Sequence, residues 1–587
     1  MTEVYDYLPI AIFGAAAVAG IWSRKASYLL DVAASVALVA LLFSPADYVS
    51  YFVLIASLAW ILISVFSLGY DLHYGRWLSS LMALTMLGMA VILISGTYLV
   101  FIAGWEVMSL AAYGIIGMNS KSHGPPYVFM MFSEISTVLI ITGSVLAVFR
   151  DGSFVTSYTP LSSDLPLLFI GLGCIIKMGI VPFMISEWLP IAHGSAPANA
   201  SAMLSATMTL MGVFMIYKLI GISPDSAAIG IFFLASGAIS VLFASLYAYI
   251  SENMKMLGGF STIENNGAIL SALGLLLMVQ GGTFRLFVSI TVIVFALAHS
   301  LGKTGLFMTA GASGHELFHQ VDSMGSYSLK LGSIISMASL SGLFPTIGGL
   351  GVWMLLESFF MEAYAGGLLG VIAIVVGSVI AIGEGMATGA MVKMISFTQI
   401  YPGGRDKLVS GRTVFATAIL LITLFLVSPL MFPAALKGAV PGTLVFYGFT
   451  IESKFGPADF GLVSPLYIAG LIVVFSVAAY AFFGNPSPRK VTGWNMGRSD
   501  RTIYTSYSYS SNIRLMLRRI LRTRVSAKGQ SLSVADVFWE SMIALANGYR
   551  RFARGITYAI MNSSIGRYIL YMILAFMLVL LISVYVF

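Results

Sequence analysis

Hydrophobic runs dominate the pattern along the chain. Stretches of about 18 or more residues that are almost free of charge recur from the N-terminus to the C-terminus, separated by short polar loops. Each run is long enough to cross roughly 30 Å of hydrocarbon as a helix that rises about 1.5 Å per residue. The pattern predicts about sixteen transmembrane helices. It also predicts a polar, amphipathic helical region near the C-terminus.

Composition agrees with this interpretation. The 587-residue chain has a mean hydropathy of +0.93, with 58% hydrophobic and 9% charged residues. One water-soluble core cannot bury that much apolar surface, so the fold class is an all-α polytopic membrane protein. The first run, about residues 5–22, follows acidic residues, Glu3 and Asp6, and not a basic region. We therefore expect a retained helix and not a cleaved signal peptide.

Two helices carry the same interruption, Gly-x-x-Pro, at residues 179–182 and 342–345. Broken helices at corresponding places in two halves indicate an inverted-repeat transporter, so we expect breaks at Pro182 and Pro345. The resulting segments are N-terminal helices (1–75), a first five-helix repeat (76–225), a second, inverted repeat (226–400), further transmembrane helices (401–484), a basic cytoplasmic linker with amphipathic helices (485–566) and a terminal transmembrane helix (567–587).

Basic residues predict the orientation. Arg24, Lys25, Lys121, Arg405 and Lys407 follow odd-numbered helices, which places these loops in the cytoplasm and both termini outside the cell membrane. Residues 485–567 hold fourteen Lys and Arg against three acidic residues, so this region by itself accounts for the positive net charge of +7, which needs no nucleic-acid partner. This basic region either lies on anionic lipid or docks against a neighbouring subunit.

Ionisable residues inside the predicted helices are the candidate functional groups. A charge at the bilayer centre costs about 2.5–3.5 kcal/mol even on the lenient insertion scale, so such residues indicate function by default. The main candidates for proton or ion translocation are Glu106, Lys177, His299 and Lys303, with Glu134, Glu357, Glu384 and Lys393 as auxiliary candidates. The alternative for Glu106 and Lys177 is a buried ion pair that only fixes helix packing.

No motif predicts a cofactor or a metal site in this chain. Cys174 is the single cysteine, the six histidines are scattered, and no nucleotide-binding fingerprint follows a strand-like segment. We therefore expect no redox centre of its own.

Several motifs together resemble one family. GWEVMSLAAYGIIGM, KMGIVPFMISEWLP, AHSLGKTGLF and SGLFPTIGGLGVW follow one another as in the antiporter-like subunits of respiratory complex I, Mrp cation/proton antiporters and group 4 membrane-bound hydrogenases. STIENNGAIL and the ending WNMGRSDRTIYTSYSYSS look most like the large membrane subunit of formate hydrogenlyase and hydrogenase-4, although Met496 stands where those relatives carry cysteine.

The resemblance implies roles for individual residues. Glu106 and Lys177 match the pair whose making and breaking gates proton movement in the family, and Lys303 with His299 matches its central lysine and histidine. It also implies partner subunits, both membrane and peripheral, that carry iron–sulfur clusters, with a [NiFe] centre as a further candidate. Three positions depart from the pattern: Leu210 and Val352 replace charged relay residues, and Met184 replaces a frequent histidine.

The expected function is translocation of protons or sodium ions, coupled to electron transfer in a peripheral arm of an oxidoreductase complex. Two alternatives stay open. One is an Mrp-type antiporter subunit without a redox arm, and the other is a structural membrane anchor whose proton path was lost at Leu210 and Val352.

Overall fold

The structure is a computed structural model of the chain. It describes residues 7–44, 47, 49–70, 74–75, 77–119, 124–150, 156–181, 184–185, 188–279, 282–321, 327–400, 413, 417–422, 444–447, 450–455, 458–484, 506–519, 524–525, 532–533, 544, 547–555, 557, 569–574 and 577.

Three apolar helices open the chain and pack together. They are α2 (Leu8–Ala19), α3 (Arg24–Leu42) and α4 (Ser50–Tyr70). Ser23 caps α3, because its hydroxyl accepts a hydrogen bond from the Ala26 amide at 3.3 Å, which satisfies one of the free donors of the first turn.

The first predicted repeat contains five spans, and the fourth is broken. In order these are α5 (Trp77–Ile94), α6 (Tyr98–Asn119), α7 (Gly124–Arg150), the broken span α8 (Leu165–Lys177) with α9 (Trp188–Ser195), and α10 (Ala198–Met203) continuing through the π-helical turn η2 (Leu204–Met208) into α11 (Thr209–Ile220). A short antiparallel pair, β1 (Ile180–Val181) and β2 (Met184–Ile185), lies within the break. Pro182 itself, and the side chain of Met184, lie outside the described residues.

The second predicted repeat has the same order of spans. It contains α12 (Ala227–Ile250), α13 (Met254–Met278), α14 (Gly282–Ala312), the broken span α15 (Tyr327–Leu340) with α16 (Ile347–Ala365), and α17 (Gly367–Ile395), with the short turns η3 (Phe318–Gln320) and η4 (Ser396–Ile400). The chain leaves the helix between α15 and α16, where Gly342 has a φ of +65° and the Phe344–Pro345 peptide is cis. Here too the fourth span is the interrupted one.

The described part of the chain is mostly helical and polytopic, as expected. Ten of its helices are long and apolar enough to cross a membrane by length and composition. The sixteen helices from α2 to α17 include three pairs that form single interrupted spans, which leaves thirteen spans before residue 400. Beyond that residue, α19 (Pro465–Phe483) is a further apolar helix.

One segment departs from the predicted helices of residues 401–484. An antiparallel sheet forms from β3 (Leu444–Tyr447), β4 (Thr450–Phe455) and β5 (Ala458–Val463), in the order β3-β4-β5. Its sequence, LVFYGFTIESKFGPADFGLV, has short β-branched and aromatic runs separated by glycine and proline, which favours strands and turns over a continuous helix. The polar residues Glu452, Ser453 and Lys454 also interrupt any apolar run of membrane length.

The C-terminal part is a separate compact unit, residues 514–587. Its described residues include the short pair β6 (Arg524–Val525) and β7 (Leu532–Ser533) and helical residues at 547–555 and 569–574. Most of the predicted terminal helix, and Met496 in the linker, lie outside the described residues. Helix α20 (Ser506–Met516) begins in the Tyr- and Ser-rich sequence, where the Ser506 hydroxyl donates a hydrogen bond to Glu252.

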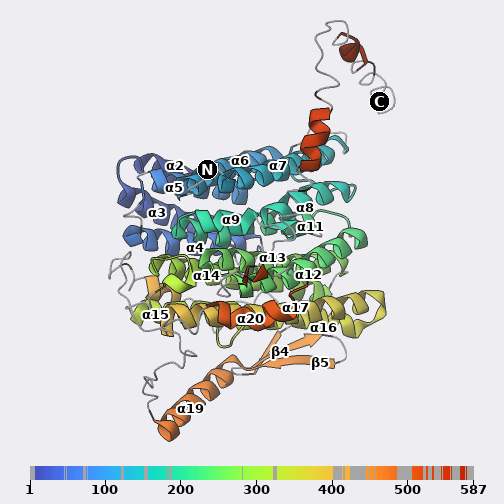
Figure 1. Ribbon diagram of the computed structural model, residues 1–587. Coiled ribbons are helices and arrows are strands. Elements are labelled where there is room, and N and C mark those ends of the chain that lie inside the picture. The colour runs from blue at the N-terminus through green and yellow to red at the C-terminus, as the bar shows by residue number, and fades with distance from the viewer. Residues whose placement is uncertain are drawn as a thin grey trace. The chain divides into compact units, whose positions relative to one another are not determined.

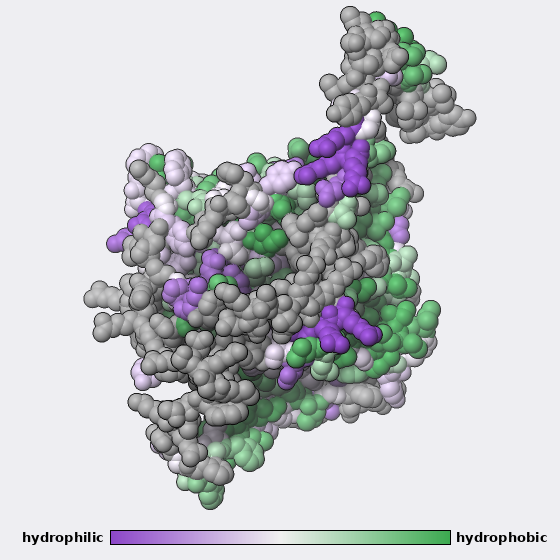
Figure 2. Space-filling view, in the orientation of Figure 1, coloured by the Kyte–Doolittle hydropathy of each residue, from purple (hydrophilic) through white to green (hydrophobic). Residues whose placement is uncertain are grey.

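Helices α12–α14 lie between the N-terminal helices and α15–α17 (Figure 1), and every described residue of α14 from Thr291 to Ala312 is buried. The outer faces of other helices, such as α7 and α17, carry large exposed hydrophobic side chains. Figure 2 shows such side chains in green along one side of the molecule. A bilayer or apolar partner subunits would cover these faces.

Glycines hold α5 and α6 at backbone contact. A Cβ atom built on Gly104 would lie 2.8 Å from the Gly88 carbonyl oxygen and 3.1 Å from the Ile92 amide nitrogen. Neither backbone group can move without moving the helix, so α5 and α6 approach closely only because these positions lack side chains.

We expect Gly104→Ala to lower the free energy of unfolding by about 1–3 kcal/mol, because the added methyl group separates the two helices. Gly117→Ala, in the same helix but with no atom within 4 Å of the new Cβ, is the matched control and should be neutral. Thermal unfolding in detergent measures both, and equal midpoints for the two variants would contradict the close contact.

Candidate functional site

The first predicted helix break places Lys177 at a helix end. Lys177 is the last residue of α8, and Gly179, with a φ of +83°, turns the chain away. The carbonyl groups left free by the break find partners from other helices. The side-chain amide of Asn266 donates to the Met178 carbonyl at 2.7 Å, and the Trp188 indole donates to the Ile176 carbonyl at 3.2 Å. The broken end is thus satisfied inside the protein.

The Lys177 ammonium group lies in a cage of hydroxyl and aromatic groups. It is 1% exposed and donates to Ser109 Oγ at 2.6 Å and to Ser133 Oγ at 2.9 Å. Its Nζ atom lies 5.5 Å from the centroid of the Trp105 ring and 5.2 Å from that of Phe129. Such faces attract a cation and offset part of its desolvation.

Glu106 lies near Lys177 without touching it. Its carboxylate accepts a hydrogen bond from Thr137 Oγ1 at 2.5 Å, and no ion pair within 4.0 Å joins it to Lys177 in the described structure. The two groups remain within electrostatic reach of one another. Ser133 and Thr137 are one turn apart on α7, so this helix supplies a hydroxyl partner to each member of the separated pair.

A second charged cluster surrounds Lys303 on α14. The fully buried Lys303 ammonium donates to Ser261 Oγ at 2.5 Å, and Ser261 in turn donates to Glu264 Oε2 at 3.3 Å. Asn265 Nδ2 donates to the same carboxylate oxygen at 2.7 Å. Glu384 of α17 lies within electrostatic reach of Glu264, and both carboxyl groups interact electrostatically with Lys303.

Glu264 was not among the residues singled out from the sequence. It is fully buried on α13, within the stretch STIENNGAIL. A signal existed, because Glu264 lies on the second helix of the second predicted repeat, as Glu106 does on the second helix of the first. Polar Ser261 and Asn265, three residues before and one after, also marked this turn of an otherwise apolar helix.

Two buried histidines and a pair of hydroxyl groups lie near the Lys303 cluster. His299, 2% exposed, lies one turn before Lys303 and against the backbone of Ser205 in the π-helical turn η2. The hydroxyl groups of Ser205 and Thr262 are 2.6 Å apart. His193, fully buried on α9, stacks on the Phe307 ring at a centroid distance of 4.7 Å, within electrostatic reach of Lys303. Helix α13 contacts both sites, through Asn266 at the α8 break and through Ser261 at Lys303.

The auxiliary candidates separate in space. Glu384 belongs to the Lys303 cluster, whereas Glu134 is exposed on α7, although within electrostatic reach of Lys177. Glu357 has its carboxyl group against the backbone of Gly461 in β5. Lys393 lies at the end of α17, where it donates to the Ser251 carbonyl at 2.6 Å and pairs with Glu252 at 3.4 Å.

Leu210 and Val352, the two apolar residues that replace charged residues of the family pattern, lie in apolar packing contacts. Leu210 is 1% exposed on α11, directly after the π-helical turn. Val352 is half-buried on α16 and packs against Gly342 at the second break, where a Cβ would lie 3.0 Å from a Val352 methyl carbon. Neither side chain exchanges a proton. Within the described ranges, no group of three or more His, Cys, Asp or Glu side chains suits a metal ion.

The chain is similar to known membrane proteins. Residues 95–381 match the transmembrane family described as NADH:quinone oxidoreductase/Mrp antiporter. Hydrogenase-4 component B of Escherichia coli (strain K12) is 30% identical over 390 residues, which cover 60% of this chain and 56% of that protein. Formate hydrogenlyase subunit 3 of the same strain is 31% identical over 257 residues, covering 40% and 39%. The matches thus span about half of each relative's length or less.

The fold as a whole also has a solved counterpart. A chain in the structure of the membrane-bound sulfane sulfur reductase, an archaeal respiratory membrane complex, superposes with a TM-score of 0.76 and covers 99% of this chain and 100% of that chain at 15% identity. A likeness at this identity shows the fold. Residues 95–381 of this polytopic membrane protein thus match the NADH:quinone oxidoreductase/Mrp antiporter family, and the chain is homologous to hydrogenase-4 component B and formate hydrogenlyase subunit 3.

Proposed function

We propose that this chain translocates protons, or sodium ions, as the antiporter-like membrane subunit of a multi-subunit redox complex in the cytoplasmic membrane. The observation that carries the proposal is the pair of buried lysine clusters, around Lys177 and Lys303, in two repeats that each contain a broken helix. The translocating groups are Glu106, Lys177, His299 and Lys303, together with Glu264 and Glu384.

Charge separation supplies the mechanism. A carboxylate next to a lysine favours the charged ammonium, and a lysine without that neighbour in an apolar site favours the neutral amine. Moving Lys177 between Glu106 and the hydroxyls of Ser109 and Ser133 therefore changes its tendency to hold a proton. One proton is released when the pair separates and one is taken up when it forms again. In the second cluster, His299 and Lys303 take up and pass on the translocated proton.

Energy for this cycle comes from partner subunits in the proposal. Relatives are named as components of hydrogenase-4 and formate hydrogenlyase, which supports a peripheral arm with iron–sulfur clusters, and a [NiFe] centre as a further candidate. Electron transfer there would shift the membrane helices through subunit contacts. The exposed apolar faces of α7 and α17 are suited to such membrane neighbours.

The apolar Leu210 and Val352 favour a second candidate, a scaffold subunit without proton transport. These positions remove two relay groups of the family pattern. The scaffold role does not explain why this chain contains buried charged clusters. A buried ion pair usually stabilises a protein no more than well-packed apolar side chains of similar volume would.

We expect Glu106→Gln to reduce proton translocation by the assembled complex by about 100-fold, because the amide cannot take or release a proton. Glu362→Gln, on α16 and outside both clusters, is the matched control and should keep the wild-type rate. Proton uptake into vesicles that contain the native complex measures both. Wild-type translocation by Glu106→Gln in an assembled complex would favour the scaffold role.

For the second cluster, Glu264→Gln is expected to lower the translocation rate by about tenfold or more, because Lys303 loses a carboxylate partner in a buried site. Glu264→Asp keeps the charge and should restore part of the rate. The measurement is the same vesicle assay with assembly checked by native electrophoresis. A normal rate in Glu264→Gln would remove this residue from the path.

Purification of the native complex in mild detergent should recover peripheral subunits that contain iron–sulfur clusters. Mass spectrometry identifies the subunits, and iron and nickel analysis identifies their metals. Recovery of cation/proton antiporter subunits alone would instead establish an Mrp-type assembly without a redox arm.

A further inference from the structure

A carboxyl group outside both clusters lies buried in the N-terminal helices. Asp31, in the middle of α3, is 0% exposed. Helix α3 packs against α2, α4 and α5, and the sequences of these three helices contain no Asp, Glu, Lys, Arg or His. Asp31 therefore has no opposite charge from the helices that surround it. A carboxyl group in such a place needs a proton, water or a cation.

Polar atoms on the adjoining helices are also without partners. Among the described residues, neither carboxyl oxygen of Asp31 accepts a hydrogen bond, and the hydroxyl groups of Ser57 and Ser64 on α4 and Ser80 on α5 make none. Buried polar groups are nearly always satisfied, so these four groups on α3, α4 and α5 require a polar partner that the protein itself does not supply. Packing alone gives no reason for them.

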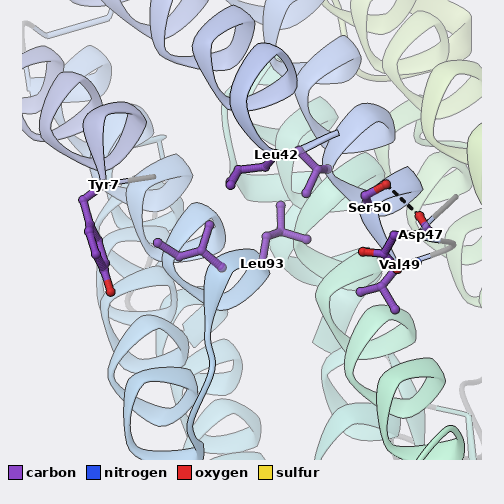
Figure 3. A pocket seen from close by; sticks show the side chains of 8 residues that line it. Tyr7, Leu42, Asp47, Val49, Ser50 and Leu93 are labelled. Carbon is purple, nitrogen blue, oxygen red and sulfur yellow. Dashed lines mark hydrogen bonds between the residues drawn. The ribbon is translucent and has the colours of Figure 1, made fainter. Parts of the chain in front are cut away.

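A cavity lies at the end where α3 finishes and α4 begins (Figure 3). It encloses about 390 Å³ and is lined by Leu42, Ser50 and Leu93, among others. Leu42 is eleven residues after Asp31, which puts both on nearly the same line of α3 with about 16 Å between them. On α4, Ser57 and Ser64 follow Ser50 at seven-residue spacing, so all three share one face.

Charges occur near this cavity. Asp47 lines the cavity and accepts a hydrogen bond from the Val49 amide at 3.0 Å. Lys218, at the end of α11, interacts electrostatically with Asp47 and donates to the Ser95 carbonyl at 2.7 Å. No further ionisable side chain of the helices around α3 lies between these groups and Asp31.

Separate polar contacts link the N-terminal helices to the central helices. Tyr28, on the buried face of α3, donates to Met82 Sδ at 3.8 Å, and Asn199 of α10 donates to the same sulfur atom at 3.4 Å and to Ser67 Oγ at 3.0 Å. The Trp60 indole of α4 donates to Thr207 Oγ1 of η2 at 3.0 Å. The N-terminal helices are therefore joined by polar contacts to the π-helical turn that lies against His299.

We propose that Asp31 is a proton-binding carboxyl group on a second polar path, which runs from the cavity at Leu42 and Ser50 through α3 and α4 to the π-helical turn η2. This rests on the proposed function, because a proton-binding group in the membrane requires a translocated proton. A proton that enters from the cavity converts the carboxylate to the acid, and its departure toward η2 restores the carboxylate. Asp31 would thereby serve the region around η2, where Leu210 has no group that can bind a proton.

The translocation test uses Asp31→Asn, Asp31→Glu and the matched control Asp225→Asn, an exposed aspartate, in vesicles that contain the native complex. We expect Asp31→Asn to lower the translocation rate by about 100-fold and Asp31→Glu to retain most of it, with Asp225→Asn unchanged. The thermal unfolding midpoint of Asp31→Asn should not fall, because the carboxylate has no structural partner to lose. A lowered midpoint with normal translocation would assign Asp31 to packing and overturn the proposal.

Comparison with Glu106→Gln separates the two proposals. Loss of translocation in Glu106→Gln with a wild-type rate in Asp31→Asn overturns the second path alone. Wild-type rates in both variants overturn the proposed function as well.

Labelling of the wild-type complex gives a readout that does not depend on activity or on folding of a variant. Dicyclohexylcarbodiimide reacts with protonated carboxyl groups in apolar surroundings. We expect mass spectrometry to find the adduct on the peptide that contains Asp31, and less of it as the pH rises. An unlabelled Asp31 across the pH range would overturn the proposal.

Discussion

The hydrogen bond from Asn266 to the Met178 carbonyl, 2.7 Å long, is the contact on which the central arrangement depends. A helix that stops inside hydrocarbon leaves carbonyl groups that water cannot reach, and each must find a donor within the protein. Helix α13 supplies that donor and, five and two residues earlier, the serine and glutamate of the Lys303 cluster. One polar turn in one helix therefore stabilises the first break and forms the second cluster.

The two clusters use different solutions to the same physical problem. Lys177 is held by hydroxyls and aromatic faces while Glu106 keeps a separate hydroxyl partner on α7. Lys303 instead contacts a serine that bridges to Glu264, and Glu384 adds a second carboxyl group. The first lysine depends on neutral groups, and the second on anions. In the proposed function, both sites can take and release a proton as the helices around them shift.

Much of this could be predicted from the sequence, because membrane helices are read from apolar runs and charges inside them stand out. The order of the spans and the placement of Lys177 at a helix end follow from that logic. Glu264 was missed because it lies among polar neighbours, and Asp31 because it lies in the N-terminal helices, outside both predicted repeats. Glu357 and Glu384 looked alike in the sequence, and only tertiary packing separates the one against Gly461 from the one beside Glu264. The sheet at residues 444–463 depends on pairing that a hydropathy pattern does not report.

The backbone contact between α5 and α6 limits the movement of Glu106 relative to Lys177. Glu106 is two residues from Gly104, where α6 is in direct contact with the backbone of α5. This contact restricts the movement of the helix that carries Glu106. Lys177 ends a helix and carries a flexible four-carbon stem. In the proposed cycle, the Lys177 ammonium group therefore moves while the Glu106 carboxylate stays in place, and partner subunits act on the helix end that carries the lysine.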